Sequence, residues 1–106
     1  MEAEELLQVR CLRVGHTETI TVIGDLDVFT APLLAAEVSK ALDADVGKII
    51  IDAADLAYID STGIGALVKA WASMKGRATM PVVVTNLRPN VQRVLDICGV
   101  TDILTE

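Results

Sequence analysis

Several kinds of residue that mark particular classes of protein are scarce in this sequence. Only Phe29, Tyr58 and Trp71 among the 106 residues are aromatic, so a core would have to be built from Val, Ile, Leu and Ala. No apolar run approaches the ~18 residues that a membrane-spanning helix needs. Acidic residues outnumber Lys and Arg by 15 to 9, for a net charge of −6. This charge argues against nucleic acid as a partner, because phosphate contacts require clustered basic residues.

The two cysteines, Cys11 and Cys98, have neither the spacing of metal ligands nor a CxxC pairing. Each falls on the apolar face of a predicted strand or helix, so we expect two buried free thiols, as in a reducing compartment. The first five residues include three glutamates and lack the basic region of a signal peptide. These features predict a cytoplasmic protein with no membrane span, no metal site and no cofactor.

Apolar residues make up 52% of the chain, enough for a core, and the length suits a single domain over residues 1–106. Alternating apolar residues predict strands at 7–12 and 19–23, joined as a β-hairpin by turn residues 15–18. His16, in that turn, is expected to be solvated. The apolar run 48–52 predicts a central strand covered on both faces.

Three amphipathic patterns predict helices. Thr30 is expected to cap the first, which closes at residues 43–47. The second follows residue 61 and ends near residue 75, and the third runs from Pro89 to a stop at Gly99.

Two further strands are predicted, at 81–85 and, as a short final strand, at 103–105. The resulting order is ββαβαβαβ. It implies a single α/β domain with a mixed central sheet packed by helices.

Five aspartates expected at strand ends, or in the loops just after strands, are candidates for a site: Asp25, Asp27, Asp52, Asp55 and Asp60. In an open α/β sheet those loops form the rim that faces ligands, so paired carboxylates there could bind a metal or perform acid–base chemistry. Aspartate is also a favoured loop and capping residue. We favour this second interpretation, because metal ligands need convergent geometry.

Gly63 and Gly65 do not make a nucleotide-binding loop. A dinucleotide loop needs a third Gly or Ala and a phosphate loop ends in Gly-Lys-Ser/Thr, whereas Leu67 and Val68 occupy those places. Glycine costs about 1 kcal/mol relative to alanine inside a helix, so two of them need another reason. Either they and Ala66 leave a bare surface for another protein, or they allow close packing within the fold.

Ser61 lies where the hydrophobic run turns into the second predicted helix. The structural interpretation is an N-cap serine, which local signals favour. The functional interpretation is a phosphoryl acceptor, because the free N–H groups of a helix N-terminus accommodate a phosphate. An independent enzyme ranks third, since the chain offers no nucleophile–base pair, metal cluster or phosphate loop.

Three segments together resemble the STAS domain of bacterial anti-sigma factor antagonists, and the similarity runs over about residues 7–105. They are Gly24-Asp25-Leu26-Asp27, Ile51-Asp52 and Asp60-Ser61-Thr62-Gly63-Ile64-Gly65. The resemblance implies the STAS fold. It also implies that Ser61 is phosphorylated by the anti-sigma factor, itself an ATP-dependent serine kinase, and dephosphorylated by a serine phosphatase. The unphosphorylated antagonist would bind the anti-sigma factor and so free the sigma factor, as in partner-switching stress responses.

The resemblance places the acidic residue Asp27 beside the phosphorylatable serine, and Thr62 where many members of the family have a second serine. A phosphoserine adds about −1.5 to −2 charges, so it would repel a partner docked beside acidic residues. The expected partner-binding surface comprises the residues around this serine: Asp25, Asp27, Asp60, Ser61, Thr62, Gly63, Ile64, Gly65 and Ala66. The alternative is a non-switching STAS subunit of a lipid-transport or stress-signalling complex, in which Ser61 is a plain cap.

Overall fold

The computed structural model of the chain describes residues 6–74 and 81–105. Its strands are β1 (Leu7–Val14), β2 (Thr17–Leu26), β3 (Lys48–Ile59) and β4 (Val82–Thr85). They form one sheet of order β1-β2-β3-β4. β1 and β2 are antiparallel, whereas β2, β3 and β4 are parallel to one another. The predicted mixed sheet is confirmed, with β3 as an inner strand.

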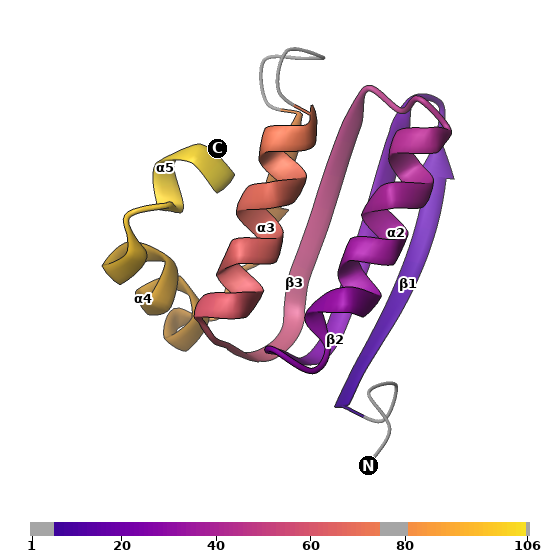
Figure 1. Ribbon diagram of the computed structural model, residues 1–106. Coiled ribbons are helices and arrows are strands. Elements are labelled where there is room, and N and C mark those ends of the chain that lie inside the picture. The colour runs from indigo at the N-terminus through magenta and orange to yellow at the C-terminus, as the bar shows by residue number, and fades with distance from the viewer. Residues whose placement is uncertain (1–5, 75–80, 106) are drawn as a thin grey trace.

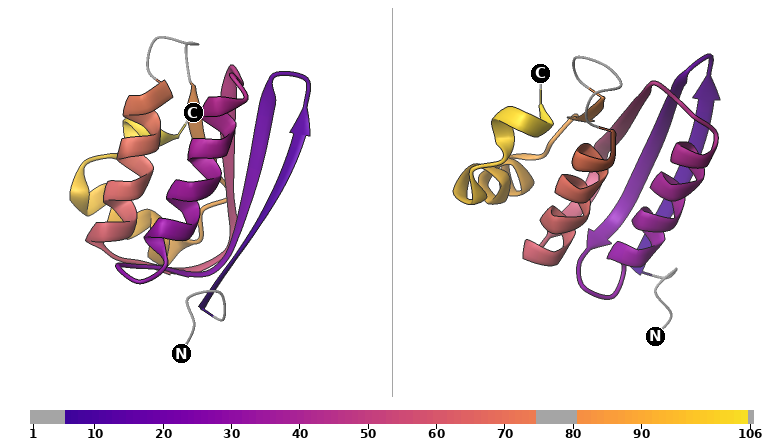
Figure 2. Two further views of the ribbon diagram at one scale, coloured as in Figure 1. Left: turned by 45° about the vertical axis from the view of Figure 1, so that its right-hand side comes forward. Right: turned by 45° about the horizontal axis from the view of Figure 1, so that its top comes forward.

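The helices in the described part of the chain are α2 (Ala31–Asp43), α3 (Ser61–Met74), α4 (Pro89–Cys98) and α5 (Thr101–Leu104). α2 and α3 run side by side along one face of the sheet, and α4 and α5 lie beyond α3, on the side away from α2 (Figures 1 and 2). No described helix is long and apolar enough to cross a membrane. The predicted end of the second helix near residue 75 lies outside the described residues.

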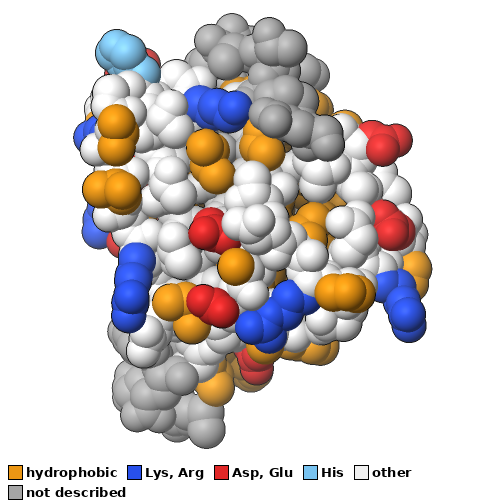
Figure 3. Space-filling view, turned by 180° about the vertical axis from the view of Figure 1, so that it is seen from behind, with side chains coloured by type: hydrophobic (Ala, Val, Ile, Leu, Met, Phe, Trp, Pro, Cys, Tyr) orange, Lys and Arg blue, Asp and Glu red, His pale blue; other side chains and the backbone are white. Residues whose placement is uncertain are grey.

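The core lies between the sheet and the pair α2 and α3. Ile49 and Ile51 of β3 are buried together with Leu34 of α2 and Leu67 of α3. Ile50 points to the opposite face and is only half-buried, so the expectation of a strand covered on both faces is wrong. Seen from that side, the hydrophobic side chains lie scattered between charged ones (Figure 3).

The hairpin turn is shorter than predicted. Only Gly15 and His16 form it, with Gly15 at φ 61°, and Thr17 and Glu18 belong to β2. Glu18 is buried because an ion pair compensates its charge, with Arg13 Nη2 2.6 Å from Glu18 Oε1. His16 is exposed in the turn, as predicted.

Both cysteines are free, as predicted, but both are exposed, so the expected burial is wrong. β1 is buried at Leu7 and becomes exposed towards its end, where Leu12 and Val14 face solvent. The alternation of apolar residues in β1 therefore predicts a strand correctly, but no other described element covers the apolar face of its second half. Cys98 lies in the last turn of α4, beyond the residues by which that helix packs, Val91 and Leu95.

The Cys11 thiol donates a hydrogen bond to Glu37 Oε2 at 3.2 Å. Part of the residue faces solvent, yet partial burial of the sulfur and then the Glu37 carboxylate raise the pKa of Cys11 to about 12. Because the thiolate is the reactive form, we expect Cys11 to alkylate at pH 8 more than about tenfold slower than the same thiol in the unfolded chain. The rate should rise in Glu37→Gln.

A Cys98→Ser background restricts the alkylation rate measured with iodoacetamide to Cys11. Equal rates in the folded and the urea-unfolded protein would contradict the expectation.

β3 extends well beyond the predicted residues 48–52 and ends at Ile59. Its buried residues Ala53, Leu56 and Ile59 are three apart, because the pairing with β2 shifts register twice along this stretch. Such bulges break the period of two that marks a strand. Asp52 and Asp55 therefore lie within a strand, where the prediction placed them at strand ends or in loops.

These two aspartates bind the segment that follows β4. Asp52 Oδ1 accepts a hydrogen bond from Asn86 at 3.1 Å, and Asp55 lies 3.5 Å from Arg88. β3 continues past the point where β4 ends, and there the side chains of Arg88 and Asn90 donate to the carbonyl groups of Ala54 and Ala57. Asp52 and Asp55 therefore have structural roles.

The third helix is confirmed as α4, which ends at Cys98 and is followed by Gly99 at the C-cap position, with φ 72°. The predicted final strand at 103–105 is wrong, because residues 101–104 form α5. Leu104 N–H donates to Val100 O at 3.2 Å, and the Leu104 side chain is fully buried. Three residues are too few to distinguish a period of two from a period of 3.6.

Candidate functional site

The loops that follow β2 and β3 meet at one end of the molecule. Parallel strands bring their carboxyl ends to the same edge of a sheet, here the lower edge in Figure 1. Asp60 N–H, directly after β3, donates to Leu26 O at the end of β2, at 3.2 Å. The loop of residues 27–30 and the first turn of α3 therefore form one surface.

Asp60, and not Ser61, caps α3. Its Oδ1 accepts a hydrogen bond from Gly63 N–H at 2.8 Å, and its carbonyl accepts the first helical bond, from Ile64 N–H at 3.0 Å. Ser61 is the first residue inside the helix, and it is exposed. Among the described residues none forms a hydrogen bond with its hydroxyl. The interpretation of Ser61 as a plain cap is therefore wrong.

Asp60→Ala should lower the free energy of unfolding by about 1 kcal/mol, the usual cost of losing an N-cap acceptor. Asp60→Asn keeps an acceptor oxygen and should stay close to the wild-type value. Urea unfolding of the two variants measures the difference. An equal loss in both would instead indicate that the negative charge at the helix N-terminus matters more than the hydrogen bond.

Asp27 organises the loop between β2 and α2. Its Oδ1 accepts hydrogen bonds from Phe29 N–H at 3.0 Å and Thr30 N–H at 3.2 Å. Thr30 is fully buried at the N-cap position of α2 but makes no side-chain cap bond. Its hydroxyl instead donates to Asp25 O at 2.8 Å and accepts from Asp27 N–H at 2.9 Å. The expectation of a Thr30 side-chain cap is corrected accordingly.

The two glycines at the start of α3 have different reasons to be glycine. A Cβ on Gly63 would lie 2.5 Å from Leu26 O and 2.8 Å from Ile59 Cγ1, so this residue allows close packing within the fold. A Cβ on Gly65 would meet nothing within 4 Å. Close packing within the fold therefore explains Gly63, whereas Gly65 lies at an open surface, and the docking of another protein there stays a prediction.

The structure brings the predicted site residues to one end of the molecule, but they differ in how far they are exposed to solvent. Ser61 and Thr62 are exposed, and Gly63 and Ile64 are buried, so the latter two support the surface and cannot contact a partner. The remaining members are half-buried: Asp25, Asp27, Asp60, Gly65 and Ala66.

Sequence reasoning missed three exposed apolar residues at this end. Val28 and Phe29 are 55% and 72% exposed in the β2–α2 loop, and Tyr58, which pairs with Asp25 in the sheet, is 52% exposed. The sequence did contain a signal for two of them, because Val28 and Phe29 are adjacent apolar residues between Asp27 and Thr30, in a segment expected to be a loop. In the described ranges no group of three or more His, Cys, Asp or Glu side chains could hold a metal ion.

Comparisons with known proteins identify the family to which the chain belongs. Residues 12–105 match the family model of the STAS domain. The chain is 34% identical over 87 residues to the anti-sigma-B factor antagonist of Listeria monocytogenes. The match covers 80% of this chain and 74% of that protein.

Two solved structures share the fold. The anti-sigma factor antagonist SpoIIAA in its unphosphorylated form has a TM-score of 0.78 at 23% identity, with 92% of this chain and 86% of that chain covered. The Bacillus cell fate determinant SpoIIAA in the phosphorylated form has a TM-score of 0.68 at 22% identity, with 93% and 88% covered. With a matching family model over most of its length and a relative above 30% identity, this chain belongs to the STAS domain family.

Proposed function

We propose that the chain is an anti-sigma factor antagonist that binds an anti-sigma factor when Ser61 is unphosphorylated and releases it when Ser61 carries a phosphate. The observation that carries the proposal is the exposed Ser61 hydroxyl at the first position of α3, with the capping role taken by Asp60. This hydroxyl is therefore open to modification without the loss of a structural bond. The Listeria monocytogenes relative and the structural neighbour SpoIIAA are anti-sigma factor antagonists, which supports this function.

The kinase would be the anti-sigma factor itself, using ATP, and a serine phosphatase would restore the unmodified state. A phosphate at this position would face the N-terminus of a helix of 14 residues, where free N–H groups and the helix dipole favour an anion. SpoIIAA, which shares this fold, has been solved in both phosphorylated and unphosphorylated forms. That pair supports a modification that the fold tolerates.

The same charge would act against binding. One added charge at ~6 Å from a like charge costs roughly 2–3 kcal/mol at an effective dielectric constant of ~20, and solvent at an exposed site reduces this cost. Asp60 precedes Ser61 directly, and Asp27 lies in the loop that meets the first turn of α3. A docked partner would exclude the water that screens these charges in the free chain, so their repulsion would grow on binding and release the partner without a change of fold. The chain would act as a binding protein in the cytoplasm.

Incubation with the cognate anti-sigma factor and ATP, followed by peptide mass spectrometry, tests the proposal. We expect a single phosphate on Ser61 and none in Ser61→Ala, and the same peptides show whether Thr62, whose side chain is also exposed, carries any phosphate. Phosphate on Thr62 or elsewhere, or no phosphate at all, would overturn the assignment. Unaltered binding after complete phosphorylation would instead favour the non-switching STAS subunit.

A further inference from the structure

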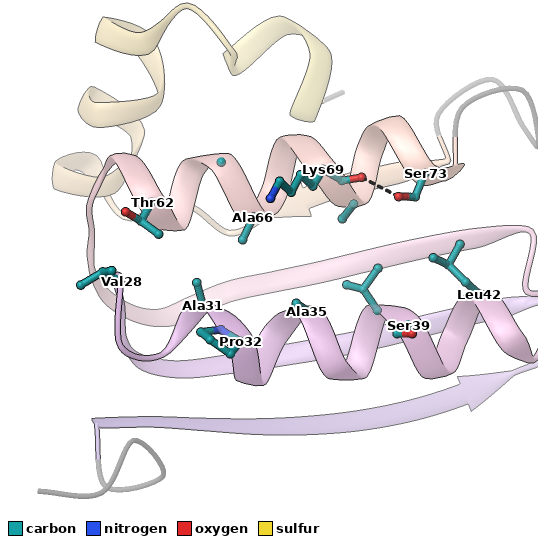
Figure 4. Close-up of a pocket in the computed structure, with 13 residues that line it drawn as sticks. Val28, Ala31, Pro32, Ala35, Ser39, Leu42, Thr62, Ala66, Lys69 and Ser73 are labelled. Carbon is teal, nitrogen blue, oxygen red and sulfur yellow. Dashed lines mark hydrogen bonds between the residues drawn. The ribbon is translucent and has the colours of Figure 1, made fainter.

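A groove of about 660 Å³ runs between α2 and α3 and opens to solvent. The two helices lie parallel beside it, with Ala31 and Leu42 pointing towards α3 and Ala66 pointing towards α2 (Figure 4). Its lining is mainly apolar and its side chains are small, with Ala35, Gly65 and Ala70 among them. Helices approach one another to 8–10 Å when the residues between them are small, so this surface can accept a third helix.

The length of the groove also suits a helix. It is lined from Ala31 to Leu42 on α2 and from Thr62 to Ser73 on α3. At a rise of 1.5 Å per residue each stretch is roughly 16 Å long, or about three helical turns. A docked helix of that length would offer anchors at positions i, i+3 or i+4, and i+7.

The charge of the groove is opposite to that of the whole chain. Lys69 is the only charged side chain in the described lining, although the chain carries a net charge of −6. Lys69 is exposed and pairs with no acidic side chain in the part of the chain that the structure describes. An occupant that neutralises it must carry a negative charge.

The position of Lys69 separates two kinds of acidic occupant. It lies between Thr62 and Ser73, with apolar lining on both sides of it along the groove. A fatty acid carries its carboxylate at one end, so pairing with Lys69 would leave part of the groove empty. An amphipathic helix with an Asp or Glu in the middle of its apolar face would fill both parts.

We propose that this groove docks an amphipathic helix of the partner protein, with a central acidic residue that pairs with Lys69. The inference rests on the proposed function, in which that partner is the anti-sigma factor. The groove begins at Val28 and Thr62, next to Ser61, so one partner can cover the phosphorylation site and the groove together. Gly65 lines the groove, and a Cβ added there would contact no atom outside its own helix backbone within 4 Å, so it would extend into open space that a docked helix could fill.

The test compares groove variants with a matched control in binding to the anti-sigma factor. Lys69→Glu and Ala35→Trp should each weaken binding at least tenfold in titration calorimetry. Arg93→Glu, the same charge change at an exposed position of α4 outside the groove, should leave it unchanged. Thermal unfolding identifies any variant that fails to fold, and amide chemical shifts of Ala35 and Ala70 in the labelled wild-type chain should move on binding.

The outcomes separate the two proposals. If the wild-type chain binds and Ser61→Asp does not, while both groove variants bind like wild type, the groove inference is overturned and the proposed function stands. If the wild-type chain binds no anti-sigma factor, the proposed function fails and the inference fails with it. A fluorescent long-chain fatty acid that binds wild type and not Ala35→Trp, together with unchanged partner affinity, would assign the groove to a lipid.

Discussion

Ser61→Asp is expected to weaken binding to the anti-sigma factor about tenfold to a hundredfold, whereas Ser61→Ala should bind as tightly as the unmodified protein. The Asp carboxylate adds one negative charge beside Asp60, and docking would exclude the water that screens the two charges in the free chain. The resulting repulsion of roughly 2–3 kcal/mol at most corresponds to about two orders of magnitude in affinity. Full phosphorylation carries nearly twice that charge, so it should weaken binding further.

Titration calorimetry at two salt concentrations measures both the affinity and its origin. If repulsion is the cause, high salt should recover part of the affinity of Ser61→Asp, because exposed charges are screened over about 8–10 Å at 0.1–0.15 M salt. Ser61→Asn serves as a control of similar size without the charge. An Asn variant as weak as the Asp variant would show that shape, and not charge, controls the contact.

Gly63→Ala is expected to lower the free energy of unfolding by about 3 kcal/mol or to prevent folding. Overpacking usually costs about 1–3 kcal/mol, and here the added methyl would lie 2.5 Å from a backbone oxygen, Leu26 O, which cannot move aside as a side chain can. Ala gains about 1 kcal/mol in helix propensity at the same position, and the clash should exceed this gain.

Gly65→Ala provides the matched comparison, two residues away in the same helix. Apart from the backbone of its own helix, no atom lies within 4 Å of its added methyl, so only the propensity gain remains and stability should rise by up to about 1 kcal/mol. Urea unfolding curves measured for both variants give the difference directly. Values within about 0.5 kcal/mol of each other would contradict the distinction between an internal and an open glycine.

The regular parts of this fold could be predicted because their patterns are regular. The run Ile49–Ile51 marks an inner strand, and the amphipathic periods of α2 and α4 give their positions to within a few residues. The remainder of β3 was missed because its bulges displace the buried residues from alternate positions. The burial of Cys11 was predicted wrongly because alternation identifies a strand and says nothing of what covers it.

The candidate site could be located from the sequence but not assigned in detail. Asp60 and Ser61 are adjacent, and both are good N-cap residues. A shift of one residue in the start of α3 would change which of them is the cap, and the sequence pattern does not resolve such a shift. Likewise Gly63 and Gly65 are two residues apart, about 200° around a helix with 3.6 residues per turn. Which of them faces the sheet depends on where the helix begins, and only the packed structure shows that Gly63 does.

The hydrogen bonds around Asp27 and Thr30 have a consequence for the speed of partner exchange. Three backbone N–H groups of this loop already have partners in Asp27 Oδ1 and Thr30 Oγ1, so the backbone of the loop loses little conformational entropy when a partner docks. Ordering a flexible backbone would cost about 1–2 kcal/mol for each residue fixed. A preorganised loop avoids that cost, and the lifetime of the complex then depends mainly on contacts that a single phosphate can alter.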